Sequence, residues 1–385
     1  MIDAIYDSLG EDERAVVDQI RRFATEILAP RAAEIDATGC SATLHLPQMA
    51  EMGLMGLNLP EQWGGLGLSG PAIYSAVEAI AAACGSTASM LTAHFLATDA
   101  LLAGADDAMK GRLLPQAAEG RMLGAFGLTE PMAGSNPADM RTFAALKDDG
   151  FHIRGSKCFI SNAGEADFMV TFAKTDKQAG ARGVSAFLIE PKDLPGVSFD
   201  RHEETMGLKG AHVFPVALDC VVPHSALIGS EGSGFKTAMI ALDNGRIEVA
   251  AQATGIANAA LEAALQYARD REVGGHPIAE FQGLQWMLAD SATELAAARA
   301  LGLQAAAKRF SGQRFSAEVA FAKLYAAEVS WKIADRALQI HGGYGYTRDF
   351  PVERYLRDLR VLRIYEGSSE IQRTIIARDL LRNTH

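Results

Sequence analysis

The sequence Ile364-Tyr-Glu-Gly-Ser-Ser-Glu-Ile-Gln-Arg373 is the most informative stretch of this 385-residue chain. It places one carboxylate, Glu366, between the apolar-flanked Tyr365 and a Gly-Ser-Ser run. Apolar surroundings disfavour the charged form of a carboxylate, so its pKa rises toward the range useful for proton abstraction. The Gly-Ser-Ser run offers a helix start with free backbone N–H groups and capping hydroxyls. Glu366 is therefore a candidate general base, although this stretch taken alone favours a simpler interpretation, a first-turn helix residue that complements the helix dipole.

Two longer blocks lie upstream and decide between these interpretations. One is Gln339-Ile-His-Gly-Gly-Tyr-Gly-Tyr-Thr-Arg-Asp349, followed by Arg354 and Asp358. The other is Ala125-Phe-Gly-Leu-Thr-Glu-Pro-Met-Ala-Gly-Ser135. The order of these two blocks, and the distance from them to the Glu-Gly-Ser run, match the pattern of the acyl-CoA dehydrogenase family of flavoproteins. The chain resembles this family over essentially its whole length.

The residue pattern divides the chain into helix, sheet and helix. Residues 11 to about 115 have helical spacing of apolar residues, with one helix predicted from Glu11 to Leu28 that stops at Pro30 and another from Pro71 to Ala103. Between about 122 and 225, short β-branched and aromatic runs alternate with turn residues, which predicts a small antiparallel sheet. Long helices are predicted after Gly234, over residues 236–271, 281–309, 316–340 and 371–381.

This order is the one that the family uses. We therefore expect an α+β, mostly α, fold with an N-terminal helical domain (1–121), a small middle β-domain (122–228) and a C-terminal four-helix-bundle domain (229–385). The sequence Gly65-Leu-Gly-Leu-Ser-Gly70 matches the dinucleotide pattern GxGxxG, but it follows Leu59-Pro-Glu-Gln-Trp63 and not an apolar strand. A loop is expected there.

Composition excludes several classes of partner. A formal net charge of −11 and a pI near 5.4 argue against nucleic acid or an anionic membrane surface. The four cysteines have no CxxC spacing and predict reduced thiols, with no metal site. The acidic N-terminus, Met1 to Ser8, lacks the pattern of a signal or transit peptide, and no apolar run reaches the roughly 18 residues of a membrane span. A cytoplasmic protein is expected.

The resemblance implies a mechanism. Glu366 removes the α-proton of an acyl-CoA thioester, FAD receives the β-hydride, and the Glu366 N–H with a flavin ribityl hydroxyl stabilises the thioester oxygen. Electrons then pass to an electron-transfer flavoprotein. Some family members carry the base directly before the arginine of an LDxxR stretch. Here that stretch is Leu242-Asp-Asn-Gly-Arg246, and Gly245 cannot act as a base.

The resemblance also assigns binding residues. The expected FAD contacts, some of them made to the FAD of a neighbouring subunit in a homo-oligomer, most commonly a tetramer, are Phe126, Leu128, Thr129, Ser135, Phe159, Ser161, Arg271, Gln282, Gln339, Gly342, Gly343, Ser368 and Glu370. The expected substrate contacts are Ser135, Asp243, Arg246, Tyr365 and Gly367.

Three positions depart from the family pattern. Asn136 stands where an aspartate is usual, Gly274 where an aromatic residue packs on a neighbour's flavin, and Glu370 where some relatives have glutamine. The first two leave cofactor affinity and substrate shape open.

The substrate is expected to be a short or short branched acyl group. Residues 71–109 contain no Lys or Arg, which disfavours a substrate with a distal carboxylate. Two alternatives remain open: a family member with diverted chemistry (an enoyl-CoA reductase or a desulfinase-like flavoenzyme), and a catalytically silent helical binding protein.

Overall fold

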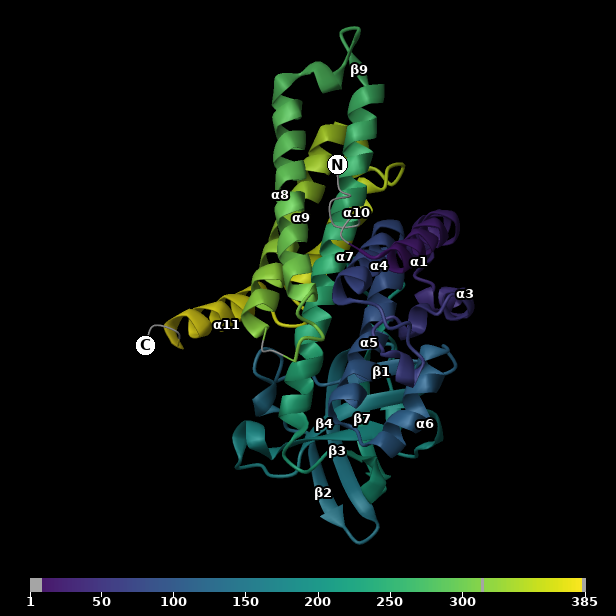
Figure 1. Ribbon diagram of the computed structural model, residues 1–385, viewed down its shortest axis with the longest axis vertical. Coiled ribbons are helices and arrows are strands. Elements are labelled where there is room, and N and C mark those ends of the chain that lie inside the picture. Colours follow the sequence, from purple (N-terminus) through teal and green to yellow (C-terminus); the bar gives the residue numbers. More distant parts are fainter. Residues whose placement is uncertain (1–8, 313–314, 383–385) are drawn as a thin grey trace.

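The structure is a computed structural model that describes residues 9–312 and 315–382; Met1 to Ser8, and the sequence features predicted there, lie outside it. Figure 1 shows an elongated molecule with a sheet at one end and a bundle of long helices at the other. The predicted order of helix, sheet and helix is confirmed.

The N-terminal domain is helical. Helix α1 (Glu11–Phe23) buries Val17, Ile20 and Phe23 on one face. The sequence predicted that this helix stops at Pro30, but the chain stays helical there. It continues through a π-helical turn and a 3-10 turn into α2 (Ala32–Thr38). Pro30 lies in the first residues of the 3-10 turn, where its missing N–H is not needed.

The predicted helix over residues 71–103 is two helices. Helix α4 (Gly70–Ala83) ends at Cys84, whose extended backbone starts a new direction, and α5 (Gly85–Gly104) follows. The loop expected from the GxGxxG match is confirmed, since no regular structure occurs over residues 65–69. The other helices of this domain are α3 (Leu46–Glu51) and α6 (Asp107–Ala118).

The middle domain is one sheet whose path runs β6-β7-β3-β2-β4-β5-β8, with β1 paired to β4. The expectation of an antiparallel sheet is wrong in part, because β1 and β2 both pair with β4 in parallel. Strand β1 enters directly from the helical domain and has no hairpin partner that would fix its direction. The strands are β1 (Gly124–Gly127), β2 (Phe143–Lys147), β3 (Gly150–Ser161), β4 (Phe168–Lys174), β5 (Val184–Ile189), β6 (Val197–Phe199), β7 (Val213–Val222) and β8 (Leu227–Ile228).

The C-terminal domain is built on three long helices, α7 (Gly234–Asp270), α8 (Gln282–Ala306) and α9 (Ser316–His341). Figure 1 shows α7 running from the sheet to the far end of the bundle, while α11 (Ser369–Arg382) projects away from it. Helix α10 (Val352–Arg360) packs against α9 and α7. A two-stranded hairpin, β9 (Glu272–Val273) and β10 (His276–Pro277), joins α7 to α8.

Helix α5 connects the two large cores. Its residues up to Phe95, such as Leu91, contribute to the core of the helical domains, and those beyond it, such as Ala97 and Leu101, contribute to the core beneath the sheet. The candidate site lies where these cores meet. No helix in the described ranges is long and apolar enough to cross a membrane.

Candidate active site

Glu366 lies in a tight turn just before α11. Its φ is +51° and that of Gly367 is +91°, so two successive residues adopt a left-handed backbone. Such a conformation is unfavourable for a residue with a side chain and persists only where its surroundings enforce it. Side-chain donors from other elements hold the turn: among them, Arg246 Nε donates to the Glu366 carbonyl at 3.0 Å, and Gln372 Nε2 donates to the Gly367 carbonyl at 2.9 Å.

The Glu366 carboxyl group lies in an apolar, largely buried environment. Its Oε2 atom is buried and has no hydrogen-bond partner among the described residues. Burial raises the pKa of this carboxyl to about 7, and the nearby cations Lys323 and Arg246 only partly offset that effect. A carboxyl group with a pKa near the working pH can both accept and release a proton.

Gly245 provides the space that this carboxyl group occupies. A Cβ atom at position 245 would lie 2.3 Å from Glu366 Oε2 and 3.0 Å from the side chain of Leu96. Positions 245 and 366 therefore face the same point, and a side chain at 245 cannot coexist with this placement of Glu366.

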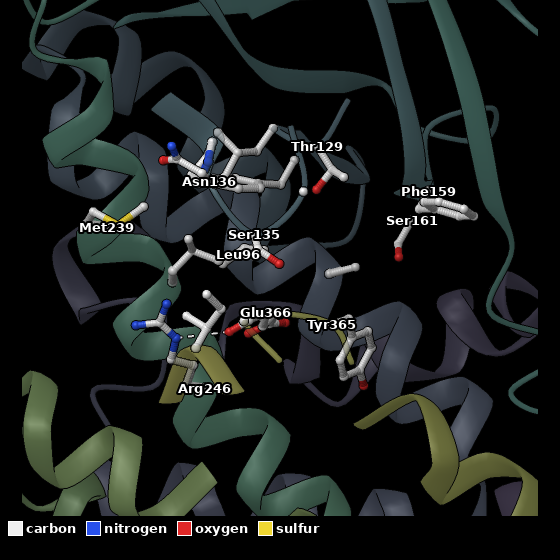
Figure 2. Close-up of a pocket in the computed structure, with 18 of the residues that line it drawn as sticks. Leu96, Thr129, Ser135, Asn136, Phe159, Ser161, Met239, Arg246, Tyr365 and Glu366 are labelled. Carbon is white, nitrogen blue, oxygen red and sulfur yellow. Dashed lines mark hydrogen bonds between the residues drawn. The ribbon is translucent and has the colours of Figure 1, made fainter. Parts of the chain in front are cut away.

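The Glu366 carboxyl faces a cavity of about 330 Å³ between the helical domains and the sheet. Figure 2 shows Glu366 and Tyr365 on one side, Thr129 opposite, and Phe159 with Ser161 on a third side. The predicted residues that line this cavity are Phe126, Leu128, Thr129, Ser135, Phe159, Ser161, Arg246, Tyr365, Glu366 and Gly367.

A bulge in strand β3 presents Phe159 to the cavity. The pairing of β3 with β7 shifts register between Lys157 and Ile160, and Phe159 has a φ of +55°. Phe159 is 64% exposed, although Lys157 and Ile160 on either side of the bulge are buried. Bulges re-aim side chains and are over-represented beside active sites.

A buried ion pair fixes the opposite wall. Lys157 Nζ lies 2.8 Å from Glu130 Oε1, and both side chains are buried. Lys157 also donates to the Leu128 carbonyl at 3.2 Å, and Glu130 accepts backbone N–H bonds from Arg141 and Thr142. These contacts hold the segment that carries Leu128 and Thr129. No motif in the sequence pointed to this pair: Glu130 lies within the quoted segment Ala125 to Ser135, but Lys157 lies outside it.

Other predicted residues lie beside the cavity without lining it. Asp243 forms an ion pair with Arg246 at 2.7 Å. Ser368 follows Gly367 in the turn, whereas Glu370 is exposed on α11. Asn136, which does line the cavity, donates to Asp139 at 2.7 Å, so a carboxylate remains within one turn of the position where the family has aspartate.

Five predicted FAD residues are not brought to this cavity. They lie at the far end of the bundle, around the end of α7, the start of α8 and the end of α9: Arg271, Gln282, Gln339, Gly342 and Gly343. All five are exposed. The Arg271 guanidinium carbon is 5.8 Å from the centroid of the Tyr344 ring, beside a second hollow lined by His341 and Phe350.

Gly274, which stands where the family has an aromatic residue, lies in the hairpin turn between β9 and β10. Gly274 and Gly275 have φ values of +63° and +84°, and no atom lies within 4 Å of a Cβ built on either. Two successive positive φ values in a two-residue loop define a type I′ turn, which glycine accommodates without strain. An aromatic residue at 274 would thus have room but an unfavourable backbone.

A buried charged cluster beneath the cavity was not predicted. Arg309, from the segment after α8, contacts Asp99 of α5 at 2.7 Å and Glu248 of α7 at 2.8 Å. Asn58 also donates to Asp99 at 2.9 Å. Asp99 and Glu248 lie one helical turn beyond Leu96 and Gly245, so the cluster is directly under Glu366. Its members are far apart in sequence and match no motif.

The chain matches the family models of the acyl-CoA dehydrogenase N-terminal domain over residues 10–121, the middle domain over 125–221 and the C-terminal domain over 232–381. The fold and the site are thus those of the acyl-CoA dehydrogenase class of flavoproteins. This chain belongs to the acyl-CoA dehydrogenase family and is a flavin-dependent oxidoreductase.

Full-length relatives agree with this assignment. The acryloyl-CoA reductase (NADH) of Anaerotignum propionicum is 41% identical over 97% of this chain and 96% of its own length. Butyryl-CoA dehydrogenase from Megasphaera elsdenii superposes with a TM-score of 0.95 at 37% identity, covering 97% of this chain and 99% of that one. A chain from a structure of the electron transferring flavoprotein of Acidaminococcus fermentans also gives a TM-score of 0.95, at 42% identity, covering 98% and 99%.

Proposed function

We propose that this protein uses FAD to oxidise a short-chain or short branched-chain acyl-CoA to the 2-enoyl-CoA, with Glu366 as the general base. The observation that carries the proposal is the Glu366 carboxyl group, which faces the cavity and whose buried Oε2 atom has no hydrogen-bond partner among the described residues. An acyl α-carbon placed there would lie against the one group on that wall able to take its proton.

The cavity walls fit a flavin ring. Phe126, Leu128 and the exposed Phe159 offer apolar surfaces, while Thr129 and Ser161 offer hydroxyls toward a polar edge. FAD, when bound, supplies a hydride acceptor. The protein's own part is to hold the thioester flat, to exclude water and to take the α-proton at Glu366. The Glu366 N–H is proposed to polarise the thioester oxygen.

The adenosine half of FAD is proposed to extend to a second copy of the chain. Arg271, Gln282, Gln339, Gly342 and Gly343 gather at one end of the bundle, exposed and away from the cavity. An arginine and two exposed glycines suit a pyrophosphate, because the backbone can approach it closely. We propose a homo-oligomer, such as a tetramer, in which this end completes a neighbour's site, and domain divisions near residues 121 and 228.

A short acyl group suits the inner end of the cavity. Tyr365 Oη donates to Gln252 Oε1 at 2.6 Å, and Gln252 Nε2 donates to Thr92 Oγ1 at 2.6 Å. This chain of hydrogen bonds links α5, α7 and the Glu366 turn behind the cavity wall. Arg309, which contacts α5 beneath the cavity, has both terminal nitrogens paired with Asp99 and Glu248, so it is not available to a substrate carboxylate.

Electron transfer to an electron-transfer flavoprotein is proposed from the resemblance and from the similar chain in the Acidaminococcus fermentans structure. A second candidate is reduction of a short enoyl-CoA, which the similarity to an acryloyl-CoA reductase favours. Both directions use the same carboxyl group, either to take or to return the α-proton.

Anaerobic titration of the purified protein with a panel of acyl-CoAs tests the proposal. Butyryl-CoA or isobutyryl-CoA should bleach the flavin absorption band faster than palmitoyl-CoA or glutaryl-CoA. A colourless protein that binds no added FAD, or a preference for palmitoyl-CoA or glutaryl-CoA, would contradict it. Reoxidation by electron-transfer flavoprotein, compared with reduction by NADH and turnover of crotonyl-CoA, separates the two directions.

A further inference from the structure

The two carbonyl groups of the Glu366–Gly367 turn are the meeting point of three helices. Arg246 of α7 donates to the first, and Gln372 of α11 donates to the second at 2.9 Å and more weakly to the first at 3.3 Å. The third donor is Lys323 of α9, whose Nζ lies 2.8 Å from the Gly367 carbonyl oxygen. No sequence motif pointed to Lys323.

Lys323 is an unusual residue for its surroundings. Its side chain is fully buried, at 0% exposure, and lysine is rarely fully buried without a charged partner. The only hydrogen bond described for its Nζ goes to a neutral carbonyl. Burial lowers the pKa of this ammonium to about 8, and the Glu366 charge is the largest influence that opposes this effect. Lys323 does not line the cavity, so it has no access to substrate or cofactor.

We propose that Lys323 is a positioning residue for the base. It fixes the left-handed turn through the Gly367 carbonyl, and it places a positive charge behind the carboxylate that Glu366 must expose to the substrate. This inference rests on the proposed role of Glu366. The turn needs such restraint, because Glu366 and Gly367 both have positive φ. It is also tightly packed, since a Cβ on Gly367 would lie 2.7 Å from the Gln372 amide nitrogen.

The charges around Glu366 predict in which direction the loss of the Lys323 charge moves the pKa of Glu366. Arg246 of α7 and Lys323 of α9 favour the ionised carboxylate, whereas Asp99 of α5 disfavours it. Farther from the carboxyl group, Asp243 pairs with Arg246 and Glu248 pairs with Arg309. Arg378 of α11 lines the cavity, and the carboxylates that face Lys323 from its other sides are Glu328 of α9, which pairs with Arg363, and Glu370 of α11. Removing the charge of Lys323 therefore takes away one of two supporting cations, and Glu366 should stay protonated to a higher pH.

The chain offers a matched control. Lys323→Met and Gln372→Met each remove a side-chain donor to the Gly367 carbonyl, but only Lys323→Met removes a charge. Both should slow anaerobic flavin bleaching at pH 7 by roughly tenfold or more, because small displacements of reacting groups are costly. Substrate affinity should change far less. Only Lys323→Met should move the acidic limb of the pH–rate profile upward, by about one unit.

The outcomes separate the inference from the proposed function. A Lys323→Met profile with the wild-type acidic limb would overturn the inference, as would an equal shift in Gln372→Met. Glu366→Gln is measured alongside: if that variant bleaches normally, the proposed function fails, whatever Lys323 does. Should Lys323→Met fold poorly, Lys323→Gln keeps a donor while removing the charge, and the same upward shift is expected.

Discussion

At the scale of single residues, Glu366 combines two unfavourable features. Its backbone is left-handed, and its carboxyl group is buried with one oxygen unpaired among the described residues. Both cost stability, and strain of this kind is typical of functional sites. The sequence predicted the residue and its role as a candidate, but the backbone conformation could not be predicted because it depends on donors from α7, α9 and α11.

The raised pKa of Glu366 predicts a pH-dependent cost. Its pKa is about 7 in the folded protein and 4.5 as the ordinary value, so the folded state binds the extra proton between these pH values. The stabilisation from that proton is complete below pH 4.5 and is lost as the pH rises through 7. Glu366→Gln does not titrate. We expect it to be more stable than the wild type at pH 8, by on the order of 2 kcal/mol, with a smaller difference at pH 5.

Thermal midpoints of both proteins at pH 5 and pH 8 check this prediction. A difference between wild type and Glu366→Gln that is the same at both pH values would show that the carboxyl group titrates normally.

Gly245 should be indispensable for activity but not for folding. Gly245→Ala forces a methyl group against Glu366 Oε2, which must move away from the cavity. We expect flavin bleaching to slow by roughly tenfold to a hundredfold. Gly111→Ala in α6 is the control, because a Cβ there meets only ordinary contact at 3.7 Å. Stopped-flow bleaching of both variants decides the matter, and equal rates would show that Glu366 is not confined by α7.

At the scale of elements, Arg309 joins the chain after α8 to α5 and α7. Both of its carboxylate partners are 1% exposed. Removing one member of a buried ion pair leaves an unpaired buried charge, which typically costs about 3–5 kcal/mol. Arg309→Met should therefore lower the free energy of unfolding by about that amount.

The exposed pair Arg154–Asp219 provides the comparison for Arg309. Arg154→Met should cost less than about 1 kcal/mol, because solvent screens that pair. Denaturant unfolding of both variants measures the two costs. Similar small losses would mean that the cluster around Arg309 contributes little to holding α5 beneath the sheet.

The long helices could be predicted from sequence because their apolar spacing repeats over many turns, and α7 and α9 begin and end within two residues of expectation. The break at Cys84 and the parallel pairing of β1 could not, since both follow from packing between distant segments. Of the candidate site residues, those in the segments around Phe126, Phe159 and Glu366 line the cavity, and their roles stay predictions. Glu130–Lys157, Lys323 and the Arg309 cluster were missed, because each joins segments far apart in sequence.

At the scale of the whole molecule, the candidate FAD residues fall into two groups. One lines the cavity, and the other lies at the far end of the bundle. The FAD site that we propose to be shared between subunits would account for this separation. Arg271→Ala should then weaken FAD binding by about tenfold or more, the usual loss for a charge-assisted bond, while bleaching at saturating FAD stays near the wild-type rate.

Titration of apo-protein with FAD, together with the sedimentation behaviour of the complex, tests the composite site. Unchanged FAD affinity in Arg271→Ala would place the adenosine half of FAD elsewhere.

The most direct test of the account is the rate at which butyryl-CoA bleaches the bound flavin in Glu366→Gln under anaerobic conditions. Glutamine keeps the size and hydrogen bonding of the side chain but cannot accept the α-proton. The variant should retain FAD and bind butyryl-CoA, yet bleach at least about a hundredfold more slowly than the wild type, as expected for loss of a general base. Bleaching near the wild-type rate would contradict the central claim and place the base elsewhere.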